Sequence, residues 1–378
     1  MEDFSRREFL QKTAVGAAAV SIAANQSGAR QAQPAVQPPP TKQLGYAIVG
    51  IGRLSIDSIL PALTTTKSSR LTALVSGHPD KAQHFAQLYG VPEKNIYNYQ
   101  NFDRIASNPD VDVVYVVLPN SMHPEYTIRA AQAGKHVLCE KPMCTSVADA
   151  QFMIEACRKA GKQLMVAYRL HYEKYTIEAI ERARTKIGKI GMFDAEMTFV
   201  IGDPTQWRLD RTLAGGGCMM DIGIYCLNGA RYIIGEEPVS VFAQSWSYDP
   251  AKFKEGVEQN ISFVLKFPSG AVANCFASYG AAGMNRYRAA GPGGWVEMDP
   301  SFTAKANLIL RYTEDGRVVT APASTVDQFE TEIDAFSDAI LQGIPNPSPG
   351  EEGLRDTRIQ MACYESAFTG KVVSLITN

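Results

Sequence analysis

The residues in this sequence best suited to chemistry are a lysine, an aspartate and a tyrosine that lie far apart along the chain. Lys141 follows a short apolar run and stands directly before Pro142. Asp221 and Tyr225 are four residues apart in a run rich in Met and Ile, so a helix would project both from one face. A carboxylate and a phenol are costly to bury without partners. We therefore interpret them as one wall of a cleft that faces Lys141. The alternative is structural: a Tyr225 with a satisfied hydroxyl and an Asp221 that caps a neighbouring element.

The elements before Lys141 must place it at the end of a strand. Apolar runs predict strands at 46–49, 71–75, 111–118, 137–139 and 164–167, and they alternate with helical patterns at 55–65, 124–133 and 146–160. This alternation predicts an α/β domain with a doubly wound parallel sheet, a Rossmann fold. Ligands of such sheets bind outside the carboxyl ends of the strands, where Glu140 and Lys141 stand.

A glycine turn follows the first predicted strand and precedes a helix, which is the context that a dinucleotide fingerprint requires. Gly50 permits a tight turn, and Gly52 lets the backbone approach a pyrophosphate at the helix N-terminus. Arg53 and Leu54 complete the turn. The third glycine of the pattern is replaced by Ser55, so a purely structural turn remains an alternative.

The end of the second predicted strand favours NADP over NAD. An NAD site usually has Asp or Glu there, on the ribose 2′-hydroxyl. This sequence has Ser76 and Gly77 instead, followed by Lys81, whose charge suits a 2′-phosphate. Asp80 argues against this interpretation, and Lys81 could also be a solvated helix residue.

Other predicted strand ends are polar too. Candidate ligands of the cofactor there are Pro119, Asn120, His123, Glu140, Lys141, Tyr168 and Arg169. Arg169 and His171 are also candidates for substrate contacts, together with Lys141, Asp221 and Tyr225.

The pattern changes in the second half. Apolar and polar residues alternate at 192–201, 238–247, 257–267 and 270–280, which predicts antiparallel strands with one buried face. Amphipathic helices are expected at 173–187, 326–342 and 350–369. We therefore expect a Rossmann domain at 44–168 and an α+β domain with an open, mainly antiparallel sheet at 169–378.

Composition excludes several classes of function. A net charge of −2 shows no basic excess for nucleic acid. The seven cysteines lack CxxC spacing and are expected to be buried free thiols, and the five histidines do not repeat at the spacing of metal ligands, so no metal site is expected.

The N-terminus resembles an export signal. A twin-arginine pattern, Arg6-Arg7, precedes an apolar run at 14–24 that is too short for a membrane span. We expect a twin-arginine signal peptide at 1–30, export of the folded protein to the periplasm, and no other membrane contact. Residues 31–43 form a proline-rich arm. The alternative is a chance arginine pair before an alanine-rich tail.

These motifs together resemble the glucose–fructose oxidoreductase/inositol dehydrogenase family over residues 44–375. The glycine turn, the Glu140-Lys141-Pro142 triplet and the Asp221–Tyr225 helix carry the resemblance, and so does Gln206-Trp207-Arg208. Tyr225 stands where most members have His, which indicates an aldose-using subgroup. The resemblance implies Trp207 and Arg208 as further cofactor contacts, tightly bound, non-exchanging NADP, and a homo-oligomer (dimer or tetramer) built through the sheets. Ser55, Leu170, Cys218 and Cys226 depart from the expected pattern.

The resemblance also implies a reaction. A sugar would lose hydride from C1 while Tyr225 takes its hydroxyl proton, with Lys141 favouring the phenolate and Asp221 holding the sugar or the lysine. The lactone leaves, and a second sugar, fructose or an aldose, takes the hydride back from the same cofactor to become an alditol. The alternatives are an NADP-dependent aldose dehydrogenase or sugar-ketone reductase with exchangeable cofactor, and a non-catalytic sugar or nucleotide sensor.

Overall fold

The computed structural model describes residues 42–254, 256–304 and 308–376. The predicted signal peptide (1–30) and residues 31–41 of the predicted arm lie outside these ranges. No helix within them is long and apolar enough to cross a membrane. All seven cysteines are free and buried, as predicted.

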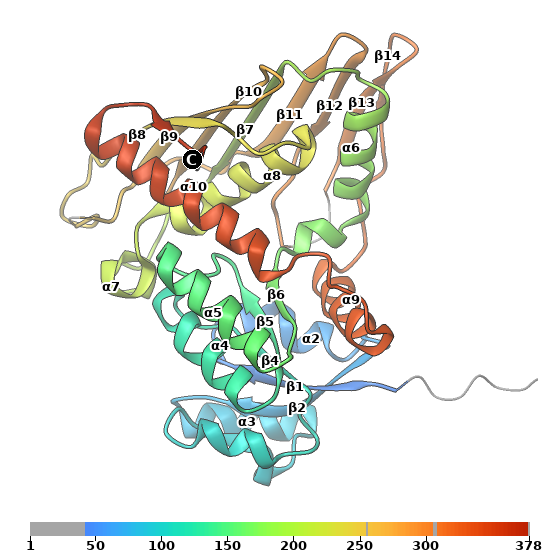
Figure 1. Ribbon diagram of the computed structural model, residues 1–378, viewed down its shortest axis with the longest axis vertical. Helices are drawn as coiled ribbons and strands as arrows, with labels where there is room; N and C mark the ends of the chain where they lie inside the picture. Colours follow the sequence, from blue (N-terminus) through green and yellow to red (C-terminus); the bar gives the residue numbers. More distant parts are fainter. Residues whose placement is uncertain (1–41, 255, 305–307, 377–378) are drawn as a thin grey trace, which may run out of the picture. The chain divides into compact units, whose positions relative to one another are not determined.

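The N-terminal half forms a six-stranded parallel sheet with the strand order β3-β2-β1-β4-β5-β6. Its strands are β1 (Leu44–Val49), β2 (Ser69–Val75), β3 (Ile96–Tyr97), β4 (Val113–Val116), β5 (His136–Glu140) and β6 (Leu164–Ala167). The four residues of β4 are fully buried, as expected for a strand covered on both faces. The predicted Rossmann sheet is confirmed (Figure 1).

Helices cover both faces of this sheet. One buried cluster joins it to α4 (His123–Gln132) and α5 (Val147–Lys159), and another joins it to η1 (Ser55–Ile59), α2 (Leu60–Ala62) and α3 (Pro79–Tyr89). Helix α9 (Gln328–Gln342) also packs in the second cluster, through Phe329, Ile333 and Phe336. From its position in the sequence, helix α9 is expected to belong to the second domain. In the structure it packs on the sheet of the first domain instead. The short turns η2 (Glu93–Asn95), η3 (Phe102–Ser107) and η4 (Asn120–Met122) connect these elements.

The second sheet has nine strands in the order β14-β13-β12-β11-β7-β10-β9-β8-β15. They are β7 (Met192–Thr198), β8 (Ser240–Trp246), β9 (Asn260–Lys266), β10 (Val272–Ser278), β11 (Asn285–Gly291), β12 (Gly294–Met298), β13 (Leu310–Glu314), β14 (Arg317–Thr320) and β15 (Val373–Ser374). The β7–β10 pair is parallel and the other pairs are antiparallel. The mainly antiparallel sheet is confirmed, and the four predicted strands match β7 to β10.

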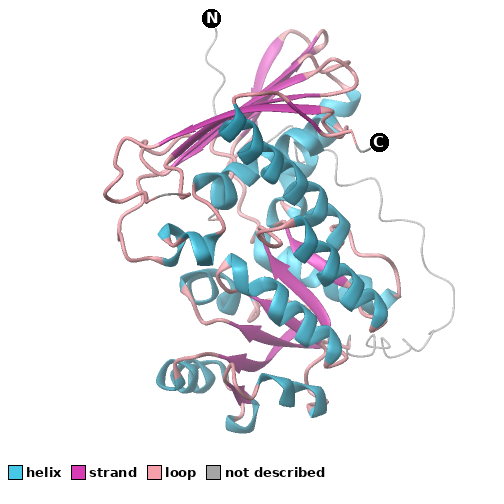
Figure 2. Ribbon diagram, turned by 60° about the vertical axis from the view of Figure 1, so that its left-hand side comes forward, coloured by secondary structure: helices cyan, strands magenta, loops and turns pink. Residues whose placement is uncertain are grey.

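One face of this sheet packs on helices. Figures 1 and 2 show α6 (Lys174–Thr185), α8 (Ile224–Ile234) and α10 (Gly350–Thr369) on the same side, and within the described ranges no helix covers the other side. Four short elements complete the second half: η5 (Arg169–Tyr172), η6 (Trp207–Leu209), α7 (Arg211–Ala214) and η7 (Met219–Gly223). Arg169, Arg208 and Asp221, described next, lie on three of them.

The glycine turn predicts a matched pair of variants. Gly50 has φ +97°, and a Cβ there would lie 2.1 Å from the carbonyl oxygen of Val117. We expect Gly50→Ala to lower the free energy of unfolding by about 2 kcal/mol or more, because both the backbone conformation and the contact are unfavourable. A Cβ on Gly52 meets no atom within 4 Å, so Gly52→Ala is the control with near-normal stability. Urea unfolding measures both, and equal stability of the two variants would contradict this account of Gly50.

Candidate active site

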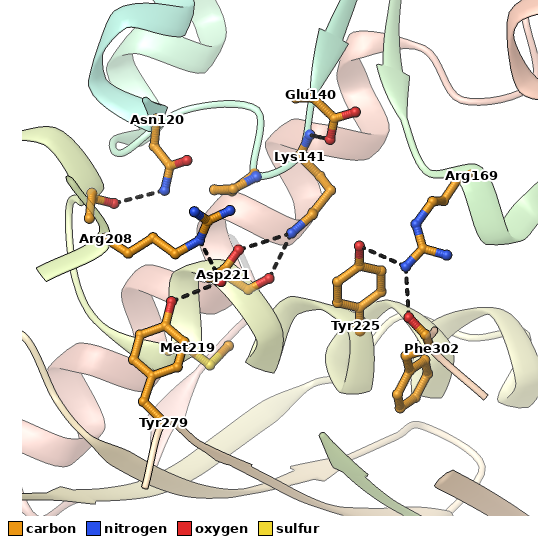
Figure 3. Close-up of polar contacts among 12 residues, drawn as sticks. Asn120, Glu140, Lys141, Arg169, Arg208, Met219, Asp221, Tyr225, Tyr279 and Phe302 are labelled. Atoms are coloured by element: carbon orange, nitrogen blue, oxygen red, sulfur yellow. Dashed lines mark hydrogen bonds and ion pairs between the residues drawn. The ribbon is translucent and has the colours of Figure 1, made fainter. Parts of the chain in front are cut away.

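Three side chains converge on the carboxylate of Asp221, which lies on η7. Lys141 Nζ donates to the Asp221 main-chain oxygen at 2.7 Å and lies 3.3 Å from Oδ1. Arg208 Nε and the Tyr279 hydroxyl each donate to Oδ2 at 2.9 Å. The four residues come from the end of β5, from η6, from η7 and from the end of β10 (Figure 3). The predicted meeting of Lys141 with Asp221 is confirmed.

The charges in this group support one another. Burial alone would raise the pKa of Asp221, but Arg208 and Lys141 outweigh it and hold that pKa well below its usual range. Burial likewise opposes the charge of Lys141, whereas Tyr225 and Asp221 favour it, and the net shift raises the pKa of the ammonium. Both Asp221 and Lys141 are therefore ionised at neutral pH.

Tyr225 lies on the same side of the helix, one turn beyond Asp221. Lys141 Nζ stands 4.6 Å from the centre of the Tyr225 ring, and the Arg169 guanidinium stands 5.1 Å from it. Arg169 Nη2 also donates to the Tyr225 hydroxyl at 3.1 Å (Figure 3). Both cations therefore lie against the phenol ring, and Arg169 also contacts its hydroxyl. This arrangement suits a group that takes and returns a proton.

A different structural constraint favours glycine at each of the three positions before the helix. Gly215 ends α7 with φ +78°, and a Cβ on Gly216 would lie 2.0 Å from the Tyr364 hydroxyl. A Cβ on Gly217 would lie 2.0 Å from the main-chain oxygen of Glu258. A larger residue at 216 or 217 would therefore require the helix or these neighbours to shift.

Glu258 holds the start of this helix. Its carboxylate accepts from the backbone N–H groups of Gly217 and Met219, both at 2.7 Å, and from the Tyr364 hydroxyl at 3.0 Å. A carboxylate at a helix N-terminus pairs with N–H groups that lack an intrahelical partner. Glu258 thereby positions Asp221 and Tyr225.

The residues at the glycine turn fit a dinucleotide. The Ser55 hydroxyl donates to the Gly50 carbonyl at 2.6 Å, so serine closes the turn in place of the third glycine. The space beside Gly52 is open. Lys81 Nζ reaches back to the carbonyl of Ile51 at 3.2 Å, and the Arg53 side chain is 94% exposed. Lys81 therefore lies at the glycine turn, and Arg53 extends from it into solvent, 3.2 Å from the carboxylate of Asp57.

Three residues close to the glycine turn and to the end of β2 contribute to packing or to a local turn. Leu54 packs at the edge of the buried cluster of η1 and α2. Ser76 is buried, and its hydroxyl accepts from the backbone N–H of His78 at 3.1 Å. Gly77 lies against the ring of Tyr99, 2.9 Å from where a Cβ would stand. A larger residue at 77 would therefore require the Tyr99 ring to shift.

One predicted cofactor ligand needs correction. His123 is fully buried, and its ring nitrogens bond to the carbonyls of Leu118, at 2.8 Å, and Pro142, at 2.9 Å. The ring has no polar atom left for a cofactor. It instead fixes the turn that carries Lys141.

Several other candidates also serve as supports. Asn120 donates to the Ala214 carbonyl at 2.9 Å and thus ties η4, which begins after Pro119, to α7. The Glu140 carboxylate accepts from the Tyr115 hydroxyl at 2.8 Å. Tyr168 is buried beside His171. Trp207 lies under the guanidinium of Arg208 at 4.5 Å.

Among these supporting residues, Arg169 makes the largest number of hydrogen bonds. Besides Tyr225, its guanidinium donates to the carbonyls of Phe302, at 2.7 Å, and Thr303, at 3.0 Å, and to the side chain of Gln328. The residue is 6% exposed. Its contribution to the site is therefore to orient Tyr225 and the loop after β12.

Sequence reasoning missed Tyr279 and Glu258. Tyr279 follows β10 and precedes Gly280, and a polar aromatic at a strand end is the signal that selected Tyr168. Glu258 has no comparable signal, because it lies 41 residues from Gly217, the helix start that it holds. Within the described ranges, no group of three or more His, Cys, Asp and Glu side chains is placed as metal ligands would be.

The fold and this site define an oxidoreductase that acts on CH–OH groups, with an NAD-binding Rossmann domain. Residues 44–168 match the family model described as "Oxidoreductase family, NAD-binding Rossmann fold", and residues 181–297 match the "GFO/IDH/MocA C-terminal domain". The chain belongs to the GFO/IDH/MocA family of oxidoreductases. The resemblance inferred from sequence motifs is confirmed at the level of the family.

Two of the similar proteins are named for reactions of sugars, and a third is a ketoreductase. The D-xylose 1-dehydrogenase [NADP(+)] of Haloarcula marismortui is 33% identical over 87% of this chain and 92% of its own length. The crystal structure of the aldose–aldose oxidoreductase from Caulobacter crescentus, complexed with glycerol, is 46% identical with a TM-score of 0.86, and the match covers 88% of this chain and 100% of that one. A 3-ketoreductase from Actinomadura kijaniata, in complex with NADP and TDP-benzene, is 25% identical with a TM-score of 0.77 over 86% and 98% of the chains.

The capping carboxylate predicts a specific loss of stability. Glu258→Gln keeps one acceptor oxygen but leaves one buried backbone N–H without a partner, which costs about 1–3 kcal/mol. We expect this loss in urea unfolding, with little change for the control Glu365→Gln, an exposed glutamate of α10. A Glu258→Gln variant as stable as the control would show that the cap contributes nothing to stability.

Proposed function

We propose that the protein is an NADP-containing aldose oxidoreductase that oxidises one sugar at C1 to its lactone and reduces a second sugar with the same bound cofactor. The observation that carries the proposal is the grouping of Lys141, Asp221 and Tyr225 at the carboxyl end of β5, next to a glycine turn that fits a dinucleotide. The names of the aldose–aldose oxidoreductase and the NADP-dependent xylose dehydrogenase support this substrate class and cofactor.

The residues that would hold NADP follow from the geometry of the turn. The backbone at Gly50 and Gly52 would accommodate the pyrophosphate at the helix start. Arg53 and Lys81 would neutralise the 2′-phosphate, and no acidic residue directly follows β2 to repel it. NADP, when bound, supplies the hydride acceptor of the first half-reaction and the hydride donor of the second.

The side chains of this protein manage the proton. In the first half-reaction the Tyr225 oxygen takes the proton of the C1 hydroxyl while the C1–H bond breaks and the carbonyl of the lactone forms. In the second, Tyr225 returns that proton to the carbonyl oxygen of the other sugar as it becomes an alcohol. Arg169, which donates to the phenol oxygen, and Lys141, which lies over the ring, would stabilise the negative charge that this oxygen carries before it takes the proton and after it returns it. Asp221, itself held by Arg208 and Tyr279, keeps Lys141 in place.

Tight, non-exchanging retention of the cofactor is part of the proposal. The twin-arginine pattern at 1–30 supports export of the folded protein to the periplasm. A soluble NADP pool is absent outside the cytoplasm, so a cofactor that is carried out in the folded protein and recycled in place would sustain turnover there. The second candidate is a dehydrogenase with exchangeable NADP, which the similarity to xylose dehydrogenase favours.

We also propose a homo-oligomer, a dimer or tetramer, that forms through the open face of the nine-stranded sheet. Trp246 and Phe276 lie on this face with ring centres 6.0 Å apart, and Trp246 is 45% exposed. Ion pairs such as Arg286–Glu196 stand beside them on the same face. Apolar rings with a charged surround are typical of protein interfaces. Light scattering of the purified protein tests this point, and a monomer would contradict it.

An absorbance experiment tests the reaction. We expect glucose alone, added to untreated protein, to produce one burst of reduced nicotinamide that is stoichiometric with the protein. Fructose, or a second aldose, added next should reverse the signal. Continuous reduction of added NADP would instead establish the exchangeable dehydrogenase. The absence of a spectral change with any sugar would contradict both and favour a sensor.

Tyr225→Phe tests the proton-transfer role. Loss of the phenol oxygen removes the acid/base group, so we expect kcat to fall by roughly 10²–10⁴-fold while bound nucleotide is retained. Nucleotide released by denaturation measures retention, and Tyr89→Phe, on the far end of α3, is the matched control. Near-normal turnover of Tyr225→Phe would remove Tyr225 from this role.

A further inference from the structure

A polar pocket lies at the edge of the Rossmann sheet opposite to the glycine turn and to Lys141. It is formed where β1, β4 and β5 begin and where α9 ends, and its volume of about 380 Å³ is within the range of small-molecule sites. The charged and imidazole side chains that line it are Lys42, Asp112, Lys135, His136 and Lys162. Strand β5 runs from His136 at this pocket to Glu140, directly before Lys141. The pocket is therefore separate from the candidate active site.

The charges that line this pocket are mainly positive. Three lysines and one aspartate give a formal net charge of +2. Among the described residues, the lysine that forms a side-chain ion pair is Lys141, with Asp221. The three lysines of the pocket therefore have no paired carboxylate. Asp112, the one acid of the lining, accepts from the backbone N–H of Gly45 at 2.9 Å.

Lys135 is the buried member of the three lysines. It is 8% exposed, and its Nζ donates to the main-chain oxygen of Asn108 at 2.9 Å. An ammonium has three N–H donors, so this bond leaves two of them unused. Burial lowers the pKa of Lys135, Asp112 opposes this shift, and the charge of Lys162 adds to it. A negative charge in the pocket would relieve this repulsion between the two lysines.

His136 adds a neutral donor to the same pocket. Its Nδ1 accepts from the backbone N–H of Gln163 at 3.1 Å, so the ring proton is on Nε2. Burial and the charge of Lys162 lower the pKa of His136 to about 4, and the ring is neutral at pH 7. In the part of the chain that the structure describes, Nε2 has no hydrogen-bond partner and is not among the polar atoms closed off from solvent.

Helix ends account for only part of this arrangement. Lys135 and Lys162 follow α4 and α5, whose C-terminal carbonyls attract positive charge. On α5, Arg158 and Lys159 in the last turn already meet that need. The helix ends require neither Lys42 nor an unused donor on the imidazole. The convergence of three lysines and one imidazole N–H on a single pocket therefore indicates a negatively charged ligand.

We propose that this pocket binds a phosphate group, either as inorganic phosphate or as part of a small phosphate monoester. A phosphate monoester carries about 1.5 to 2 negative charges at pH 7, which complements the formal charge of the lining. The lysines act as point charges toward it, and His136 Nε2 donates to one phosphate oxygen. The site is independent of the proposed sugar reaction.

NMR of the histidine rings at pH 7 and constant ionic strength locates the bound phosphate. We expect inorganic phosphate to shift the ring signal of His136, assigned from its loss in His136→Gln, and to saturate by about 10 mM, tenfold above a millimolar Kd. His78 precedes α3 at the end of β2 and reports binding near the glycine turn instead. No saturable shift of His136, a shift of His78 alone, or an equal shift with acetate would overturn the proposal.

Lys162→Gln tests the contribution of the lining charge. We expect the Kd for phosphate, measured in the same titration, to rise about tenfold, because a hydrogen bond between charged groups is lost. The matched control is Lys159→Gln, which removes an exposed lysine from the last turn of α5 outside the pocket. It should leave the Kd near the wild-type value. The same Kd in both variants would show that these lysines serve the helix end alone, and the proposal would fail.

Glucose 6-phosphate distinguishes the two sources of the phosphate group. Tighter binding than that of inorganic phosphate, with the same shift of His136 and the same loss in Lys162→Gln, assigns the pocket to a monoester. Equal or weaker binding assigns it to the free ion. The titration involves no sugar turnover, so a failure of the proposed reaction and a failure of this site are separate results.

Discussion

One buried carboxylate, that of Asp221, organises the site. A charge removed from water is tolerated only when opposite charges and hydrogen bonds replace the lost hydration. Asp221 obtains this from Lys141, Arg208 and Tyr279. These partners come from the end of a Rossmann strand, from a short helical turn and from the end of a strand of the second sheet. The need to compensate one charge thus joins the two halves of the protein where the chemistry takes place.

Tyr225, on the same helix as Asp221, is also held by a buried cation, Arg169. Arg169 spreads its guanidinium over Tyr225, the loop at Phe302 and Gln328 of α9. Because α9 packs on the Rossmann sheet, Arg169 links that sheet to the phenol. Asp221 and Tyr225 are therefore fixed from opposite directions, and the helix that bears them has little freedom to turn.

Close backbone packing completes this positioning. Gly216 and Gly217 approach Tyr364 and Glu258 more closely than any residue with a Cβ permits. The approach allows the Glu258 carboxylate to reach the N–H groups at the helix start. Positioning to within about half an ångström is what acid–base catalysis requires of its supports. These supports come from elements that follow the Rossmann strands in the sequence, Glu258 before β9 and Tyr364 on α10, so the precision of the site depends on the second half of the chain.

The sequence by itself determined five of the six strands of the Rossmann sheet, β7 to β10, the glycine turn and the placement of Asp221 and Tyr225 on one face of a helix. These depend on local signals: apolar period, glycine placement and four-residue helical spacing. It did not reveal β3, β15 or β11 to β14, whose outward side chains include Arg286 and Arg288, paired with glutamates of neighbouring strands. Only the tertiary structure decided that α9 joins the first domain, that His123 supports a turn, that Tyr279 contacts Asp221 and that Glu258 holds the start of the helix. Each of these depends on contacts between residues remote in sequence, and a local pattern carries no information about such partners.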